Sequence, residues 1–158
     1  MIVSQNRLSR DIVREPIFLY AQIRKEVRNV GHWQPYNPNP QGKAVGDCAV
    51  RACTVATRKS WDDVYMELTL EGFARCDLIS ANHVWGRYLK KHGYTREFVR
   101  DDCETCYTVD DFCREHPKGT FILALTGHVV AVQDGNYLDS WDSGREVPIY
   151  YWHKEDDR

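Results

Sequence analysis

The chain has 158 residues, of which 42% are hydrophobic and 12% aromatic, which is enough apolar material for one core and argues against disorder. Its 21 basic and 23 acidic residues give a formal net charge of −2. A nucleic-acid-binding protein usually carries a basic surplus, so we expect no nucleic-acid partner. The length corresponds to a single domain over residues 1–158.

No apolar run approaches the roughly 20 residues of a membrane span, and the first residues are too polar and charged for a secretory signal. We therefore expect no membrane partner and a cytoplasmic location. A cytoplasmic chain with its own core does not need disulfides, so we expect reduced thiols. The cysteines are Cys48, Cys53, Cys76, Cys103, Cys106 and Cys113.

The first expected elements are a helical stretch over residues 1–31 and a loop over residues 32–47. Apolar residues recur near one face of the stretch, and Gly31 would cap it. The loop is long and rich in Pro, Asn and Gly, and long ordered loops tend to line functional sites. Its aromatic residues, Trp33 and Tyr36, are expected to wall a substrate groove.

A helix is expected from Asp47, because small apolar residues recur at helical spacing through the segment GDCAVRACTVAT. This helix is apolar on most sides, which is typical of a central helix. Two further helices are expected over residues 60–72 and 80–93, with Ser60 and Ser80 as their N-caps.

The second half of the chain has the pattern of a β-sheet, interrupted by one short helix that Thr108 caps and Pro117 stops. A turn at Asp134–Asn136 is expected to join two strands into a hairpin. Pro148 suggests that the last strand lies at an edge of the sheet. The expected strands cover residues 94–100, 120–125, 127–133, 137–141 and 146–154. Because helices come first and the sheet second, the predicted fold class is α+β.

Cys48 stands where the turn at Gly46–Asp47 becomes the central helix. A thiol attacks well only as a thiolate, and a helix N-terminus and a neighbouring imidazolium both lower its pKa. His128 at a strand start and Asp139 on the next strand would lie near the open end of the predicted hairpin. There the carboxylate can accept the imidazole N–H and fix its tautomer. We therefore expect Cys48, His128 and Asp139 to form a catalytic triad.

Three segments resemble papain-like cysteine peptidases, namely GDC before the helix, GHVVAV around His128, and DSW from Asp139 to Trp141. The chain is also similar to small papain-like proteins of bacteria and their phages, and to bacterial peptidases that process bacteriocin leaders. The segment GDCAVRA resembles ovarian-tumour-type deubiquitinases as well. The resemblance covers roughly residues 35–145 and implies a papain-like fold, with a helical N-terminal half packed on a C-terminal antiparallel sheet.

The resemblance also implies an oxyanion-binding side chain upstream of Cys48. Papain-like peptidases usually place a Gln there, and Gln41 is the Gln close upstream, with Asn37 and Asn39 as alternatives. The backbone N–H of Cys48 is a further donor, because it opens a helix. Trp141 is expected to shield the His–Asp pair from water and to contact the substrate.

Two other groups of residues offer alternatives. Cys103, Cys106, Cys113 and His116 have the spacing C-x2-C-x6-C-x2-H, which could supply four zinc ligands, although Cys113 is more simply an apolar-face residue of the short helix. We expect no metal and no cofactor. Asp142 could replace Asp139, but its segment WDSG favours a role in holding a turn.

These patterns predict a thiol hydrolase that cleaves a peptide, isopeptide or related amide bond of a peptide or protein substrate through a thioester. Three alternatives remain open: a transamidase or acyltransferase with the same triad, a catalytically silent binding protein such as a phage protein that sequesters a host factor, and a metal-stabilised interaction module. Substrate specificity is expected in the loops at residues 33–46 and 76–80.

Overall fold

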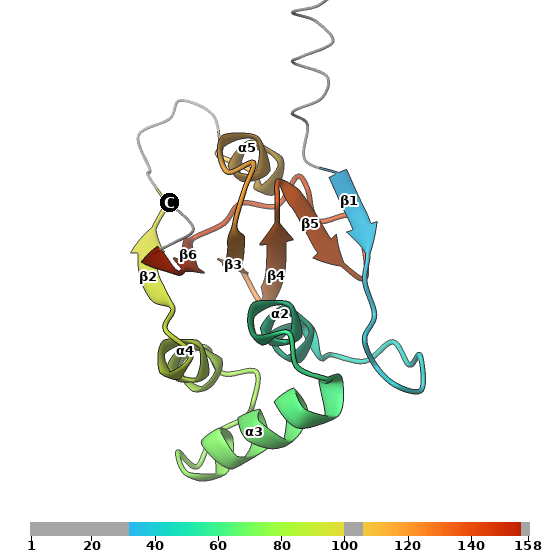
Figure 1. Cartoon of the computed structure of the whole chain (residues 1–158), viewed down its shortest axis with the longest axis vertical. Helices are drawn as coiled ribbons and strands as arrows, with labels where there is room; N and C mark the ends of the chain where they lie inside the picture. Colours follow the sequence, from blue (N-terminus) through green and yellow to red (C-terminus); the bar gives the residue numbers. More distant parts are fainter. Residues whose placement is uncertain (1–31, 100–105, 156–158) are drawn as a thin grey trace, which may run out of the picture.

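The computed structural model of the chain describes residues 32–99 and 106–155 (Figure 1). Within these ranges it has four helices and a six-stranded mixed sheet, which confirms the α+β class. The predicted helix over residues 1–31 lies outside them. The helices are α2 (Cys48–Thr57), α3 (Trp61–Phe73), α4 (Asn82–Lys91) and α5 (Val109–Glu115). The strands are β1 (His32–Pro35), β2 (Thr95–Phe98), β3 (Thr120–Leu125), β4 (His128–Gln133), β5 (Asn136–Asp139) and β6 (Tyr150–His153).

The strand order across the sheet is β1-β5-β4-β3-β6-β2. The pair β1–β5 is parallel, and the other neighbours are antiparallel. The predicted hairpin of β4 and β5 is confirmed, with Gln133 opposite Asn136. Its two turn residues, Asp134 and Gly135, have φ angles of 50° and 74°, as a tight hairpin turn of type I′ requires. This turn fixes the register, so the start of β4 and the end of β5 meet at the open end of the hairpin.

Three expectations about individual elements are wrong. His32–Pro35 was expected in a loop but forms β1, an edge strand whose residues are all exposed, so Pro35 costs the sheet no buried hydrogen bond. Strand β6 lies between β3 and β2 rather than at an edge, because Pro148 precedes the strand and Ile149 already donates to the Ala124 carbonyl. Helix α4 begins after Ala81 rather than after Ser80, and no described side chain caps it.

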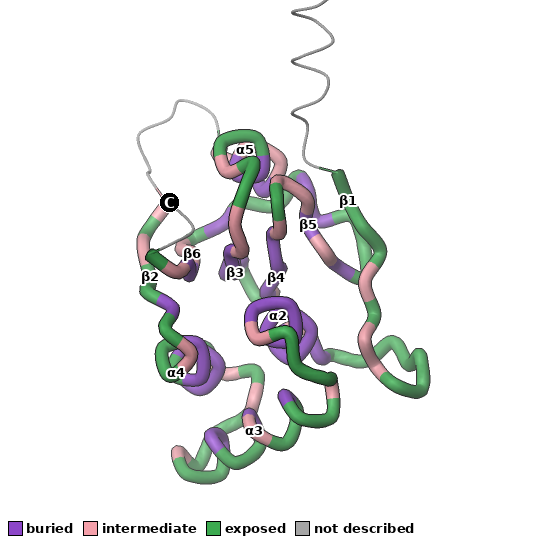
Figure 2. Tube along the Cα trace, viewed as in Figure 1, coloured by how far each residue is buried: buried purple, intermediate pink, exposed green. Residues whose placement is uncertain are grey.

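The sheet is covered on both faces. Side chains alternate along the strands, so Ile122, Ala124 and Ala131 pack with α2, α3 and α4, while Phe121 and Leu123 pack with α5 on the other face. Figure 1 shows α2, α3 and α4 gathered together and α5 apart from them. Helix α2 is buried from Ala49 to Ala56 (Figure 2). The helix that begins with Cys48 is therefore central, as the sequence predicted.

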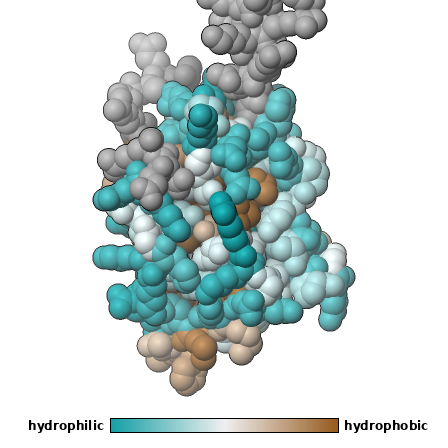
Figure 3. Space-filling model, in the orientation of Figure 1, coloured by the Kyte–Doolittle hydropathy of each residue, from teal (hydrophilic) through white to brown (hydrophobic). Residues whose placement is uncertain are grey.

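Exposed apolar side chains gather where α3 ends, at the lower end of the molecule in Figure 3. Phe73 is 84% exposed and Leu78 is 73% exposed. In the described ranges, no helix has both the length and the apolar composition needed to cross a bilayer.

Candidate active site

Cys48, His128 and Asp139 come from three elements that meet at one end of the sheet. Cys48 is the first residue of α2, His128 is the first residue of β4, and Asp139 is the last residue of β5. Helix α2 packs on β4 through one apolar cluster that includes Val129 and Ala131. The three predicted triad residues are thus brought together by the helix–sheet packing and by the tight hairpin.

Asp139 holds the imidazole of His128. The distance from His128 Nε2 to Asp139 Oδ2 is 2.6 Å, and the Asp139 side chain is only 1% exposed. The same carboxylate accepts the Ser143 hydroxyl at 2.8 Å and the Ser140 backbone N–H at 2.7 Å. Burial opposes ionisation of Asp139, but the hydrogen bond and charge of His128 outweigh it and hold the pKa of the carboxyl below its usual range. The ionised form of Asp139 is therefore favoured as the hydrogen-bond partner of the His128 ring.

Cys48 and His128 share a hydrogen bond that favours their charged forms. Burial alone would raise the pKa of the Cys48 thiol, but the hydrogen bond and charge of His128 and a backbone hydrogen bond from Val129 lower it below 9.0. Burial would lower the pKa of His128, but Asp139 and Cys48 raise it to about 9. The lowered pKa of the thiol and the raised pKa of the imidazole both favour the thiolate–imidazolium form of the pair over the neutral form.

Asp139 also belongs to a buried ion network that the sequence did not predict. Arg51 is 6% exposed and its guanidinium bonds the carboxylate of Asp47 and, at 3.3 Å, that of Asp139. Trp61 donates its indole N–H to the other oxygen of Asp47 at 2.9 Å. The spacing of Asp47 and Arg51, four residues apart on a helix, was the available signal. Its partner Asp139 is 88 residues away in sequence, so the full network could not be read from spacing.

The other residues of the DSW region have structural roles. Asp142 accepts the hydroxyl of Tyr137 and the backbone N–H of Gly144, so it holds the turn after β5. The ring of Trp141 lies 5.4 Å from the ring of His128, measured between centroids, and is 43% exposed. Trp141 thus covers one side of the imidazole while keeping an open face.

Strand β1 and the loop between it and α2 carry the remaining predicted site residues. Trp33 donates to the Asp139 carbonyl at 3.1 Å and is 40% exposed, whereas the Tyr36 hydroxyl bonds Thr54 on α2. Asn37 and Asn39 use their side chains to fold the loop itself. Gln41 is exposed in the same loop, and its side chain bonds no other described residue.

The predicted zinc ligands are only partly within the described ranges, because Cys103 lies outside them. Cys113 is buried in the apolar cluster under α5, and burial raises the pKa of its thiol to about 12. His116 stacks on Phe112 with ring centroids 4.0 Å apart. Over residues 32–99 and 106–155, no three His, Cys, Asp or Glu side chains cluster as metal ligands would. The cysteines in these ranges are all free thiols.

Comparison with known proteins gives no match: no family model fits the sequence, and searches of curated proteins and of solved structures find no significant similarity.

Proposed function

We propose that the chain is a thiol hydrolase of papain-like fold that cleaves a peptide, isopeptide or related amide bond. Cys48 is the nucleophile, His128 is first the acid and then the base, and Asp139 orients His128. The observation that carries the proposal is the 2.6 Å hydrogen bond from His128 Nε2 to Asp139 Oδ2, because it leaves Nδ1 for the thiol. A peptide or protein substrate and a cytoplasmic location, where the thiol stays reduced, belong to the same proposal.

The proposed reaction has two steps. In the first, the Cys48 thiolate attacks the substrate carbonyl carbon, and the S–C bond forms. The His128 imidazolium protonates the amide nitrogen as the C–N bond breaks, so an amine leaves and a thioester remains. In the second, His128 takes a proton from water while the water oxygen attacks the thioester. The S–C bond breaks, a carboxylic acid leaves, and the thiolate–imidazolium pair is restored.

The negative charge that develops on the carbonyl oxygen needs donors. The backbone N–H of Cys48 is one proposed donor, since no side chain caps the start of α2 and its first amides remain available. Gln41 is the proposed second donor, because its side chain amide has no other described partner in the loop before α2. Loss of one such donor typically lowers kcat about 10²–10³-fold.

Two measurements test the proposal. Iodoacetamide at pH 6, read site by site by mass spectrometry, should modify Cys48 ahead of the other five thiols. A peptide library derived from a bacterial proteome should then acquire new termini with the native protein and none with Cys48→Ala, whose folding is checked by circular dichroism. If Cys48 reacts no faster than the other thiols and the library stays intact, the proposal fails and a binding protein becomes the better reading.

A further inference from the structure

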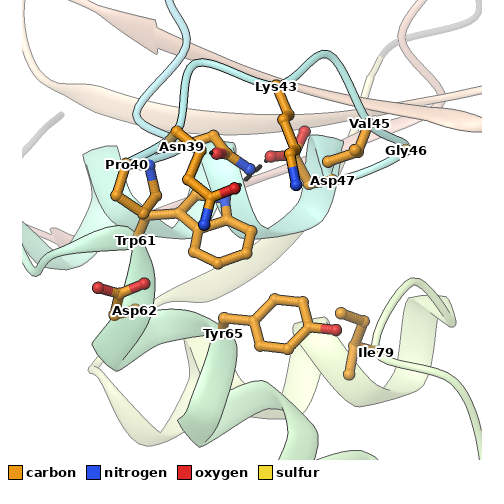
Figure 4. Close-up of a pocket in the computed structure, with 11 residues that line it drawn as sticks. Asn39, Pro40, Lys43, Val45, Gly46, Asp47, Trp61, Asp62, Tyr65 and Ile79 are labelled. Carbon is orange, nitrogen blue, oxygen red and sulfur yellow. Dashed lines mark hydrogen bonds between the residues drawn. The ribbon is translucent and has the colours of Figure 1, made fainter.

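A cavity of about 470 Å³ lies beside the start of α2. One side is formed by the loop from Asn39 to Gly46 and by Asp47, and the opposite side by Tyr65 of α3 and by Ile79 (Figure 4). Its volume lies within the range of about 300–1,000 Å³ that is usual for ligand sites. The two loops expected to carry specificity, residues 33–46 and 76–80, thus both contribute to its walls.

The cavity is adjacent in the chain to the nucleophile. Gly46 and Asp47 line it, and Cys48 is the next residue. Because consecutive Cα atoms are about 3.8 Å apart, the Cα atom of Cys48 lies one residue step from that of Asp47 in the cavity wall. A side chain seated in the cavity would therefore belong to a residue close to the bond that Cys48 attacks.

The walls combine polar side chains, among them Asn39 and Gln41, with an apolar and aromatic part formed by Val45, Trp61, Tyr65 and Ile79. Trp61 and Tyr65 stack with ring centroids 4.7 Å apart and planes at 19°. Tyr65 is 39% exposed and Val45 is 46% exposed, so both have apolar surface that a ligand could cover. The hydrogen bond from the Trp61 indole to Asp47 fixes the orientation of this aromatic wall before any ligand arrives.

The charges around the cavity compensate one another. Asp47 is already paired with Arg51, and the exposed Lys43 and Asp62 have opposite signs. With Arg51 counted against Asp47, the formal charges of the described residues at the cavity sum to zero, so neither an acidic nor a basic side chain is favoured by net charge. A buried charged group without a partner would be costly there, so the walls favour a neutral occupant.

We propose that this cavity is the subsite for a large apolar or aromatic side chain of the substrate, within two residues of the scissile bond. This inference rests on the proposed function, because it is the reaction of Cys48 that gives the cavity a substrate. Tyr65 and Val45 determine the specificity, and Trp61 forms the rigid aromatic wall.

The test uses two series of peptidyl fluoromethyl ketones that alkylate a reactive thiol. One series varies the residue at the reacting carbonyl, and the other varies the residue before it, with Phe, Leu, Ala, Lys or Glu at the varied position. The readout is the rate constant for modification of Cys48 divided by the rate constant with iodoacetamide, so a change in thiol reactivity itself cancels. In one series, the rate constants of the Phe and Leu probes should exceed those of the Lys and Glu probes at least about tenfold, because removing an apolar side chain from water favours binding.

Two variants and one control connect this preference to the cavity. Tyr65→Ala should reduce the preference for Phe severalfold, and Val45→Asp should shift it toward Lys. Phe73→Ala, which removes an 84% exposed side chain from the other end of α3, should leave it unchanged. Equal rates for Phe and Glu probes, or a Phe preference that both cavity variants retain, would overturn the inference.

A binding measurement distinguishes failure of the proposed subsite from failure of the proposed hydrolase function. The indole N–H signal of Trp61 in a proton–nitrogen NMR spectrum is followed during titration with acetyl-Phe-Gly-amide and, separately, acetyl-Glu-Gly-amide. A shift with the Phe peptide alone supports the cavity as an apolar subsite even if Cys48 shows no selective alkylation. No shift with the Phe peptide, together with equal probe rates, refutes the subsite even if Cys48 is reactive.

Discussion

Helices α2 and α5 lie on opposite faces of the same sheet, and they begin in different ways. At α5, Thr108 accepts the Asp111 backbone N–H at 3.2 Å, and the Asp111 carboxylate accepts the Thr108 N–H at 3.0 Å. At α2, the preceding Asp47 makes no such bond to the first turn, and its carboxylate faces Arg51 and Trp61. The first amides of α5 are thus partly satisfied by side chains, whereas those of α2 remain available to a bound anion.

The cysteines of the two helices also differ, in the pKa of their thiols. The Cys48 pKa is lowered because the hydrogen bond and charge of His128 outweigh the effect of burial, while burial and the charge of Asp110 raise the pKa of Cys113 to about 12. Both thiols belong to helices that pack on the sheet. The comparison shows that the charged partner decides the direction of the shift: His128 lowers the pKa of Cys48 despite burial, whereas Cys113 has only burial and the negative Asp110, which both raise it.

The largest expected effect is on the free energy of unfolding, when one arginine of each helix is replaced. Arg51→Met leaves the carboxylates of Asp47 and Asp139 buried without their cation, so we expect a loss of about 3–5 kcal/mol in the free energy of unfolding. Arg114→Met on α5 removes a half-exposed pair with Asp111 and should cost less than about 1 kcal/mol. Urea denaturation of both variants measures this, and equal losses would contradict a supporting role for the buried network.

The second largest effect is expected on the rates at which the Cys48 and Cys113 thiols are alkylated. In His128→Ala, Cys48 loses its hydrogen-bonding and charged partner, so its alkylation by iodoacetamide at pH 6 should slow by about a hundredfold or more. Cys113 should stay unreactive in the native protein and in the variant, because it is buried. His116→Ala, at the end of α5, serves as the control and should leave Cys48 unchanged. An unaltered Cys48 rate in His128→Ala would mean that the imidazole does not activate the thiol.

The pH dependence of His128 gives a third test. Because Asp139 and Cys48 favour the imidazolium, its pKa is raised from 6.5 to about 9, and the cation should persist up to that pH. In Asp139→Asn the hydrogen bond remains possible but the negative charge is gone. The pKa should then fall by about one unit or more toward the ordinary value. The imidazole proton signals in an NMR titration report the pKa of His128 directly. Asp142→Asn is the control variant and should leave this pKa near its native value.

The smallest expected effect concerns the start of α5. Thr108→Ala removes the capping hydrogen bond and should lower the free energy of unfolding by about 1 kcal/mol. It should leave the alkylation rate of Cys48 unaltered, since α5 covers the other face of the sheet. A thermal unfolding curve checks the loss of stability, and the alkylation rate of Cys48 checks that the thiol is unaffected. A slower Cys48 would mean that the two faces are coupled.

The meeting of Cys48, His128 and Asp139 was predictable because each lies at the end of an element that the sequence marks clearly. The turn at Gly46–Asp47 locates the start of α2, and the two-residue turn of the β4–β5 hairpin brings His128 near Asp139. Contacts between distant segments were not predictable in this way. Strand β1 has no alternating pattern, and its place is set by pairing with β5, about a hundred residues later. Ser143 reaches Asp139 through a turn whose shape sequence reasoning did not provide.

Contacts between distant segments also explain why the place of β6 in the sheet and the start of α4 were predicted wrongly. Pro148 indicated an edge strand, but it lies just outside β6, where a missing N–H does not matter. Ser80 is a better capping residue than Ala81, yet α4 begins after Ala81, because tertiary packing of Val84 and Trp85 decides where the helix starts. Local preference predicted these elements well and their exact ends less well.

The burial of α2 on all sides has a consequence for how a substrate is received. A helix enclosed from Ala49 to Ala56 cannot tilt or slide without opening the core, so Cys48 is held in place before anything binds. In the proposed hydrolase, the entropic cost of ordering Cys48 would be met during folding and would not recur in each catalytic cycle. In the proposed hydrolase, adaptation to different substrates would then come from the mostly exposed loop between Asn37 and Gly46, since the enclosed helix cannot adjust.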